Sequence, residues 1–219
     1  MSISYTLRQP SKNKYGDVRD DIQRLVELNP NQMSFDEYVY LNKSIESKNG
    51  CNLLIFGLGK DSDLWLHANQ NGKTIFIEDN VDWIKSVKTQ MDNMGKQIDI
   101  REITYTDTGY DADKLLDEYD SGTNNLKLNL PEDVKNTRWD IIVVDAPAGY
   151  GNDMPCRMKS IYESYNLSND NDNVDVFVHD AQRKIEKMYT EYFFKNYSHI
   201  KTFDDNKHGV LQHYRSVNE

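Results

Sequence analysis

The chain of 219 residues contains little cysteine, no excess of positive charge and no long apolar run. Its two cysteines, Cys51 and Cys156, have no metal-binding or redox motif around them, which favours the reducing cytoplasm. A formal net charge of −10 argues against a nucleic-acid partner, because phosphates favour a basic face. No stretch reaches membrane-spanning length, and Met1–Tyr5 lacks a signal-peptide core. We therefore expect a cytoplasmic protein that inserts into no membrane.

The sequence does contain an alternation of helical and strand patterns. Helical spacing of apolar residues predicts helices over residues 17–28, 34–48, 63–68, 81–94, 112–119, 155–165 and 181–196. Short apolar or alternating runs predict strands over residues 52–56, 74–77, 98–105, 139–144, 174–178, 200–203 and 209–214. We expect residues 1–30 to form an N-terminal arm and helix, and residues 31–219 to form one domain.

The last two predicted strands are too close together for a crossover helix, so we expect them to form an antiparallel hairpin. The predicted fold class is therefore α/β, with a seven-stranded, mostly parallel sheet and helices on both faces. This order is typical of the Rossmann-like class I methyltransferase fold. A nicotinamide-binding domain would continue with another crossover helix instead.

A glycine turn follows the first predicted strand, and an acidic pair ends the second. Gly57 and Gly59 lack a Cβ and let the backbone approach a ligand closely. Glu78 and Asp79 come about 20 residues later, where the ribose of a bound nucleoside would lie. The alternative is an ordinary strand–helix turn, in which Asp61 or Ser62 caps the next helix. The predicted cofactor-binding residues are Gly57, Gly59, Asp61, Ser62, Glu78 and Asp79.

Polar residues also end two later strands, where Asp145 and His179-Asp180 follow apolar runs. Ligands of open α/β sheets bind at the carboxyl ends of the strands, so we expect these three residues to be catalytic. A carboxylate there can take a proton from a hydroxyl, and Asp145 with Asp180 can hold a divalent cation such as Mg²⁺ or Mn²⁺. Each carboxylate can instead cap a helix or bond a loop. His179 can be a base, a metal neighbour or a buried hydrogen-bonded side chain.

Side chains after these strand ends are candidates for binding the acceptor. Tyr150 is expected to close over it, and Arg157 and Arg183 to meet an anionic group such as a uronate or phosphate. Both arginines can instead be solvated. The three tryptophans are expected in the core rather than as sugar platforms; they are Trp65, Trp83 and Trp139.

Taken together, these motifs resemble the glucuronoxylan 4-O-methyltransferase family. The matching segments are Phe56–Ser62, Phe76–Asp79, Trp139–Tyr150, Arg157-Met158, Val176–Asp180, then Arg183, Glu186 and Tyr189, and finally Gly209–Tyr214. The resemblance runs from about residue 33 to residue 215. It implies S-adenosylmethionine as the methyl donor, held by the glycine turn and Glu78, and a glycan hydroxyl as the acceptor. It also implies that Asp145, His179-Asp180 and His213 face the acceptor.

The sequence departs from this family in ways that bear on the acceptor. Cys156 replaces a usual glycine, and Gln212 replaces a usual aromatic residue. Plant members have an N-terminal membrane anchor that this chain lacks, so neither a Golgi location nor xylan is carried over. The predicted function is methylation of a sugar hydroxyl, on a uronate or a deoxysugar such as rhamnose. The alternatives are a non-catalytic nucleotide- or glycan-binding subunit of polysaccharide biosynthesis and a nicotinamide-dependent sugar oxidoreductase.

Overall fold

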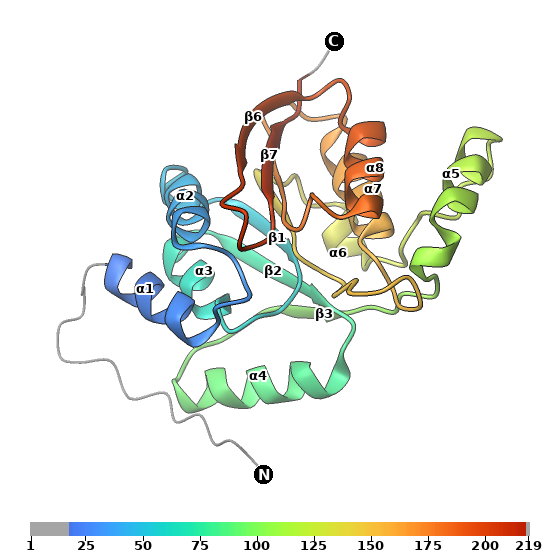
Figure 1. Ribbon diagram of the computed structural model, residues 1–219. Helices are drawn as coiled ribbons and strands as arrows, with labels where there is room; N and C mark the ends of the chain where they lie inside the picture. The colour runs from blue at the N-terminus through green and yellow to red at the C-terminus, as the bar shows by residue number, and fades with distance from the viewer. Residues whose placement is uncertain (1–17, 218–219) are drawn as a thin grey trace.

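The computed structural model describes residues 18–217, so the expected N-terminal arm lies outside the described residues. The helices are α1 Val18–Leu28, α2 Phe35–Glu46, α3 Ser62–Ala68, α4 Val81–Asn93, α5 Ala112–Asp120, α6 Glu132–Lys135, α7 Met158–Ser168 and α8 Lys184–Phe193, with a 3-10 turn at Gly109–Asp111. The strands are β1 Asn52–Phe56, β2 Lys73–Glu78, β3 Ile100–Glu102, β4 Ile141–Val144, β5 Asp175–Val178, β6 Ser198–Phe203 and β7 Leu211–Arg215 (Figure 1). Within this range, no helix is long and apolar enough to cross a membrane.

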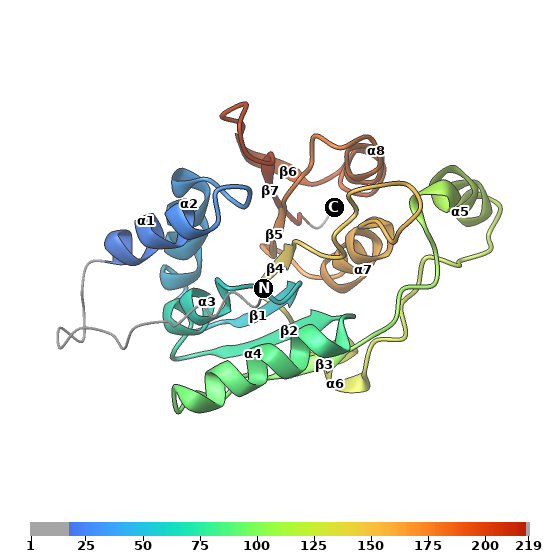
Figure 2. The same cartoon turned by 60° about the horizontal axis from the view of Figure 1, so that its bottom comes forward.

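One seven-stranded sheet organises the molecule, in the order β3-β2-β1-β4-β5-β7-β6. Strands β1 to β5 pair in parallel, whereas β7 pairs antiparallel with both β5 and β6. The predicted sheet and its terminal hairpin are therefore confirmed. Helices cover both faces, and Figure 2 shows α4 and α7 on different sides of the strands. Because β4 lies next to β5, Asp145 and His179-Asp180 emerge side by side.

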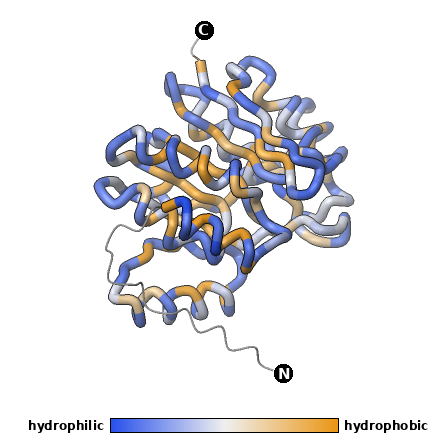
Figure 3. The backbone as a smooth tube through the Cα atoms, turned by 60° about the vertical axis from the view of Figure 1, so that its left-hand side comes forward, coloured by the Kyte–Doolittle hydropathy of each residue, from blue (hydrophilic) through white to orange (hydrophobic). Residues whose placement is uncertain are grey.

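Two hydrophobic clusters fill the space between the sheet and its helices. Successive β1 residues alternate between them: Leu54 packs with α5 to α8, whereas Leu53 packs with α1 to α4. Strands covered on both faces need apolar side chains at every position, as all four buried residues of β4 show. Figure 3 shows these apolar strand segments inside a more polar exterior. Trp65 and Trp139 belong to the core as predicted, while Trp83 is only partly buried.

Element boundaries differ from the prediction at two helix starts, where backbone N–H groups bond partners outside the helix. The helix predicted from Pro155 begins at Met158, because the backbone N–H of Arg157 points to Glu186 Oε1 at 3.4 Å. The last helix begins at Lys184 rather than Ala181, whose N–H donates to the carbonyl of Val210. The third strand is shorter than predicted, and α6 was not predicted.

Candidate functional site

A cleft of about 500 Å³ lies at the carboxyl ends of β1, β2, β4 and β5, which is within the usual size range of small-molecule sites. Of the predicted cofactor-binding residues, its wall contains Gly57, Gly59, Asp61, Glu78 and Asp79. Of the predicted catalytic and acceptor-binding residues, it contains Asp145, Tyr150, Arg157, His179, Asp180 and Arg183. Ser62 and His213 are not part of the wall. The structure thus brings most of the predicted residues into one cavity.

The glycine turn after β1 lies against the next strand end. Gly57 has a φ of +122°, and a Cβ there would lie 3.3 Å from the Cβ of Ala146. A Cβ on Gly59 would collide with the carboxylate of Asp61. Ser62 is fully buried, and its Oγ accepts a hydrogen bond from Gly59 N at 3.1 Å. The prediction that Ser62 binds the cofactor is therefore corrected, because its hydroxyl stabilises the turn from inside.

Glu78 connects this turn to the end of β2. Its carboxylate accepts backbone hydrogen bonds from Leu58 at 3.0 Å, Asp79 at 3.1 Å and Asn80 at 2.9 Å. Burial raises the pKa of the Glu78 carboxyl, although these N–H groups favour its ionised form. Glu78 is thus a fixed acceptor at the cleft wall, and Asp79 beside it also lines the cavity.

Asp61 provides a second carboxyl group at the wall of the cleft, in the glycine turn after β1. It stands at the N-cap position of α3 but makes no side-chain cap bond. Instead it bonds the side chains of Tyr38 and Trp65. Burial and then the negative charge of Asp145 raise the pKa of Asp61 to about 7. A cationic ligand beside Asp61 would therefore favour its ionised form.

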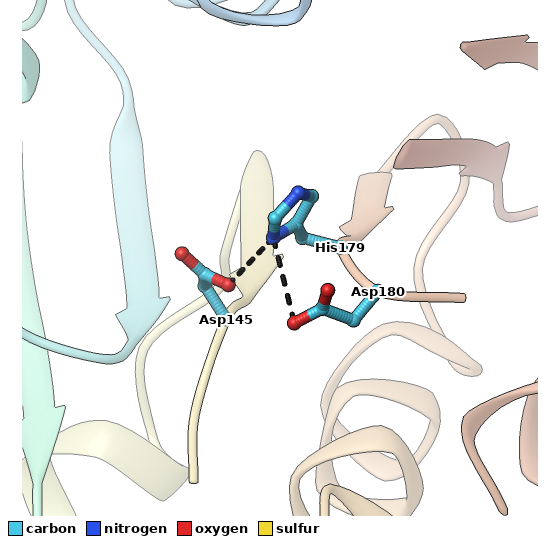
Figure 4. A group of neighbouring side chains, drawn as sticks. All are labelled: Asp145, His179 and Asp180. Atoms are coloured by element: carbon cyan, nitrogen blue, oxygen red, sulfur yellow. Dashed lines mark hydrogen bonds and ion pairs between the residues drawn. The ribbon is translucent and has the colours of Figure 1, made fainter. Parts of the chain in front are cut away.

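Asp145, His179 and Asp180 form a compact group at the ends of β4 and β5 (Figure 4). His179 Nδ1 lies 3.0 Å from Asp145 Oδ1 and 3.8 Å from Asp180 Oδ2. The side chain of Asp145 is 23% exposed, whereas that of His179 is only 4% exposed. Asp145 therefore offers the group's accessible proton acceptor, and its second oxygen points away from His179 (Figure 4).

The side chain of Arg157 is buried behind these carboxylates. Its Nη2 lies 3.0 Å from Asp145 Oδ1 and 2.8 Å from Asp180 Oδ2. Its Nε donates to the Pro147 carbonyl at 3.2 Å, and its Nη1 donates to the His179 carbonyl. These bonds occupy the guanidinium with protein groups. Arg157 lines the cleft, but its guanidinium braces Asp145 and Asp180, so a contact with an anionic acceptor stays a prediction.

Arg183 stabilises the same group from the start of α8. Its Nη2 lies 2.8 Å from Asp180 Oδ2, and its Nη1 donates to the Ala148 carbonyl at 2.7 Å. The guanidinium also lies over the ring of Tyr150, 5.4 Å from its centroid. Asp180 has a left-handed φ of +58°, which is uncommon for a residue with a Cβ. The two arginine contacts hold it there.

Opposite charges set the ionisation of the pair Asp145 and His179. Burial alone would raise the pKa of Asp145, but His179 and Arg157 outweigh it and leave the pKa below its usual value. Burial would lower the pKa of His179, but Asp145 outweighs it and leaves that pKa raised. Asp145 is therefore held as a carboxylate, and the imidazole of His179 is more readily protonated than that of a free histidine.

The predicted cation pair, Asp145 and Asp180, lies close together in this group. One ligand atom from each of Asp145, His179 and Asp180 lies within 4.8 Å of the others. However, Arg157 Nη2 already bonds both carboxylates and supplies the positive charge that a cation would bring. The donor set thus fits a guanidinium better than Mg²⁺ or Mn²⁺, which need several free oxygen ligands.

His213 lies away from the cleft, inside the sheet. Its Nε2 is 2.9 Å from Asp175 Oδ1, and its Nδ1 is 2.9 Å from the hydroxyl of Tyr40. The ring stacks on Phe177 with centroids 4.1 Å apart. The prediction that His213 binds the acceptor is therefore corrected, since it pairs with Phe177 across β5 and β7, before the strand end.

The N-terminal helices contribute to the cleft, which the sequence allowed as one of their possible roles. Tyr38 of α2 lines it, together with Leu25, Asn29 and Met33 from α1 and the following turn. We expected these helices to cover apolar sheet surface, which they also do. The capping pattern Ser34-x-x-Glu37 was the available signal, and both bonds of that capping box are present.

Comparisons with known proteins agree with this architecture. Glucuronoxylan 4-O-methyltransferase 3 of Arabidopsis thaliana is 33% identical over 197 residues, which cover 84% of this chain and 63% of the relative. Arabinogalactan O-methyltransferase 2 of the same plant is 28% identical over 206 residues, covering 85% and 68%. This chain thus spans less than two-thirds of the length of the first relative.

A solved structure shares the fold. The O-methyltransferase TomG from Streptomyces achromogenes, which is involved in tomaymycin synthesis and was solved in complex with SAM, superposes with a TM-score of 0.53. It is 13% identical, and the match covers 94% of this chain and 92% of that one. The predicted Rossmann-like class I methyltransferase fold is confirmed. The family model described as IRX15/IRX15L/GXM matches residues 36–214, which confirms the resemblance seen in the motifs, and the chain belongs to this family.

Proposed function

We propose that the protein is an S-adenosylmethionine-dependent O-methyltransferase that acts on a sugar hydroxyl of a glycan or glycoconjugate. The observation that carries this proposal is the position of the Asp145–His179 pair beside the glycine turn, in one cleft. A methyl donor on one side and a hydroxyl on the other would meet next to an ionised carboxylate. Membership in a family with named O-methyltransferases supports the same reaction.

The residues on the β1–β2 side of the cleft fit the donor. Because Gly57 and Gly59 have no Cβ atom, they let the donor approach the backbone closely. Asp61 would pair with the donor's ammonium group, and Glu78 and Asp79 would accept bonds from ribose hydroxyls. S-adenosylmethionine supplies a methyl group on a positively charged sulfur.

Asp145 is the proposed proton acceptor. As the new C–O bond forms and the S–CH₃ bond breaks, the sulfur keeps the bonding electrons. The proton on the hydroxyl oxygen then becomes strongly acidic. A carboxylate with a lowered pKa can then take the proton, and it is ionised throughout the neutral range. The main task of the site is to align the two reactants. Asp145 can return the proton to solvent, because its side chain is partly exposed.

The acceptor is proposed to be a uronate or a deoxysugar such as rhamnose. The named relatives include enzymes for two different polysaccharides, glucuronoxylan and arabinogalactan, so the family accommodates more than one acceptor. Tyr150 is 75% exposed at the cleft mouth, with its ring against Arg183. Such an exposed ring would provide a surface for a sugar.

A non-catalytic nucleotide- or glycan-binding subunit is the second candidate. The family also includes IRX15 proteins, whose names do not refer to methyl transfer. A nicotinamide-dependent oxidoreductase fits less well, because the sheet ends in the hairpin of β6 and β7 instead of a further parallel strand.

A methyl-transfer screen against free sugars and glycosides separates these candidates. We expect transfer from S-adenosylmethionine to at least one uronate or deoxysugar, and calorimetric binding of both the donor and its demethylated product. Donor binding without transfer to any acceptor in the panel would favour the non-catalytic subunit. Binding of NADH in place of the methyl donor would contradict the proposal.

A further inference from the structure

Glu37 and His179 each have a buried polar atom without a hydrogen-bond partner among the described residues. The atoms are Glu37 Oε1 and His179 Nε2. The two residues are only 1% and 3% exposed. An unpaired buried polar atom is costly, so such an atom in a native protein calls for a partner such as ordered water. A carboxylate oxygen and an imidazole nitrogen are chemically suited to share one.

Glu37 is held rigidly at the start of α2. Its other oxygen, Oε2, accepts a hydrogen bond from Ser34 N at 2.6 Å, as part of the capping box. Burial raises the pKa of Glu37, whereas the bond from Ser34 and the charge of nearby His179 act against that rise. The cap therefore uses one carboxylate oxygen and leaves Oε1 without a hydrogen bond among the described residues, while Glu37 and His179 act on each other electrostatically.

The imidazole of His179 is oriented by contacts on two sides. Nδ1 faces Asp145 Oδ1 at 3.0 Å, so Nε2 points away from that carboxylate (Figure 4). Behind the ring lies Gly209, where a Cβ would approach within 2.7 Å of Nε2 and 2.9 Å of Cε1. A glycine at this position gives the ring room to present Nε2 to the interior.

Carboxylates face His179 from several elements. Its contacts are with Asp145 at the end of β4 and with Asp180 beside it, and the charge of Arg157 opposes theirs. Asp61 in the glycine turn and Glu37 in α2 also act on it electrostatically. The 3.0 Å contact with ionised Asp145 requires a proton on Nδ1. With Nδ1 protonated, the ring is neutral if Nε2 has no proton and positively charged if Nε2 also carries one.

We propose that Glu37 is a positioning residue that keeps His179 doubly protonated, through one buried water linking Nε2–H to Glu37 Oε1. The water accepts from Nε2–H and donates to the carboxylate, which satisfies both unpaired atoms. His179 then lies as an imidazolium between Asp145 and Glu37.

The consequence for turnover rests on the proposed methyl transfer. An imidazolium at Nδ1 keeps Asp145 ionised and fixes its orientation, so that its free oxygen faces the acceptor hydroxyl. Without the charge of Glu37, Nε2 would lose its proton and the hold on Asp145 would weaken. Glu37 itself touches neither reactant in this scheme.

Nitrogen-15 NMR of the histidine side chains tests the protonation state without requiring activity. In the wild type at pH 7.5, we expect both ring nitrogens of His179 to have the chemical shifts of protonated nitrogens. The signals are assigned by comparison with His179→Gln. Glu37→Gln keeps an oxygen for Ser34 N but removes the charge, so we expect its His179 to be neutral. Ser34→Ala, which weakens the same cap without changing the charge, should leave His179 doubly protonated.

Kinetics test the role in turnover. We expect Glu37→Gln to lower kcat about tenfold to a hundredfold with little change in KM, and Ser34→Ala to lower it less than about threefold. A neutral His179 in the wild type, or identical His179 signals in the wild type and Glu37→Gln, would overturn the proposal. An unchanged kcat in Glu37→Gln would also overturn it. If no methyl transfer is found at all, the proposed function fails while the NMR result still decides the state of His179.

Discussion

At the scale of single residues, the site assigns different tasks to two neighbouring groups. Asp145 is partly exposed and ionised, whereas His179 is buried with Nδ1 directed at Asp145. On the proposed function, Asp145 rather than the buried His179 would therefore take the proton from the acceptor. This separates two roles that the sequence left open for His179, because burial and ring orientation are set by the fold.

Replacing the proposed base tests this assignment. Asp145→Asn keeps the shape but removes the proton acceptor, so we expect turnover to fall by about 10²–10⁴-fold. Donor affinity, measured by calorimetry, should change little, because the proposed donor contacts lie at the glycine turn and β2. Retained turnover in Asp145→Asn together with its loss in His179→Gln would instead identify His179 as the base.

Asp61 gives a pH dependence with a defined direction. Its pKa is raised from 3.8 to about 7, so the unfolded chain releases this proton first, and the folded protein becomes progressively less stable as pH rises from about 4 to about 7. Asp61→Asn removes that penalty. We expect the variant to be more stable than the wild type at pH 8, by on the order of 1 kcal/mol, and to lose this advantage as pH falls to about 4. Urea unfolding at both pH values measures the difference.

The same substitution should weaken donor binding. If Asp61 pairs with the donor's ammonium group, the wild-type donor affinity should fall as pH decreases below about 7, where Asp61 takes up its proton. Asp61→Asn should bind the donor weakly at every pH. A wild-type affinity that is independent of pH between 6 and 8 would contradict this pairing.

The position of a predicted residue in the cleft could be foreseen from the sequence where the residue directly follows a strand end. Gly57, Glu78 and Asp145 line the cleft because the carboxyl ends of neighbouring parallel strands meet there. Ser62 and His213 do not, because one turns under the glycine loop and the other lies before the end of its strand. Whether a polar side chain faces a cleft or the interior depends on register, which spacing alone does not fix.

At the scale of elements, the chain segment between β4 and α7 is built around Arg157. Its side chain bonds the β4–α7 loop at Pro147 and the end of β5 at His179. Its backbone N–H points to Glu186 of α8. The sequence predicted a helix from Pro155 because proline suits a first turn. These long-range bonds to Arg157 delay the helix, and no local pattern announces them.

The charge of Arg157 predicts that methyl transfer needs no divalent cation. Since its Nη2 neutralises both Asp145 and Asp180, we expect full turnover in excess EDTA. The matched test is Arg157→Met, which removes the charge and should abolish turnover that Mg²⁺ does not restore. Loss of wild-type activity in EDTA and its recovery with Mg²⁺ or Mn²⁺ would instead support the cation pair predicted from the sequence.

At the scale of the whole molecule, the candidate site and a stabilising ion-pair network lie at opposite ends of the sheet. The cleft lies at the carboxyl ends of the parallel strands, whereas Asp175 begins β5 at the other end. Strand alternation and the closing hairpin made this architecture predictable, since each strand carries its own apolar signal. The sequence allowed α1 and α2 to cover an edge, the cofactor mouth or apolar sheet surface and could not decide among these roles, because the choice depends on where amphipathic helices dock.

Asp175 joins the elements at that distal end of the sheet. It is 2% exposed and contacts Lys48 at 3.0 Å, His213 at 2.9 Å and Arg215 at 2.7 Å. Burial would raise the pKa of Asp175, but the bonds to His213, Arg215 and Lys48 outweigh it and lower the pKa well below its usual value. Lys48 follows α2, and His213 and Arg215 belong to β7, so one carboxylate links three parts of the fold.

Removing this charge should destabilise the protein without affecting the cleft. Asp175→Asn leaves His213 and the two cations without their counter-charge, and we expect the free energy of unfolding at pH 7 to fall by about 3 kcal/mol. Because the folded pKa is lowered, the wild type should begin to lose this stabilisation as pH falls below about 4, so the difference between the two proteins should be smaller at pH 3 than at pH 7. Urea unfolding at pH 7 and pH 3 measures this, with the exposed Asp170→Asn as the control. Equal stability of Asp175→Asn and the wild type at pH 7, or a loss of donor binding in the folded variant, would show that the network does not act as a distal brace.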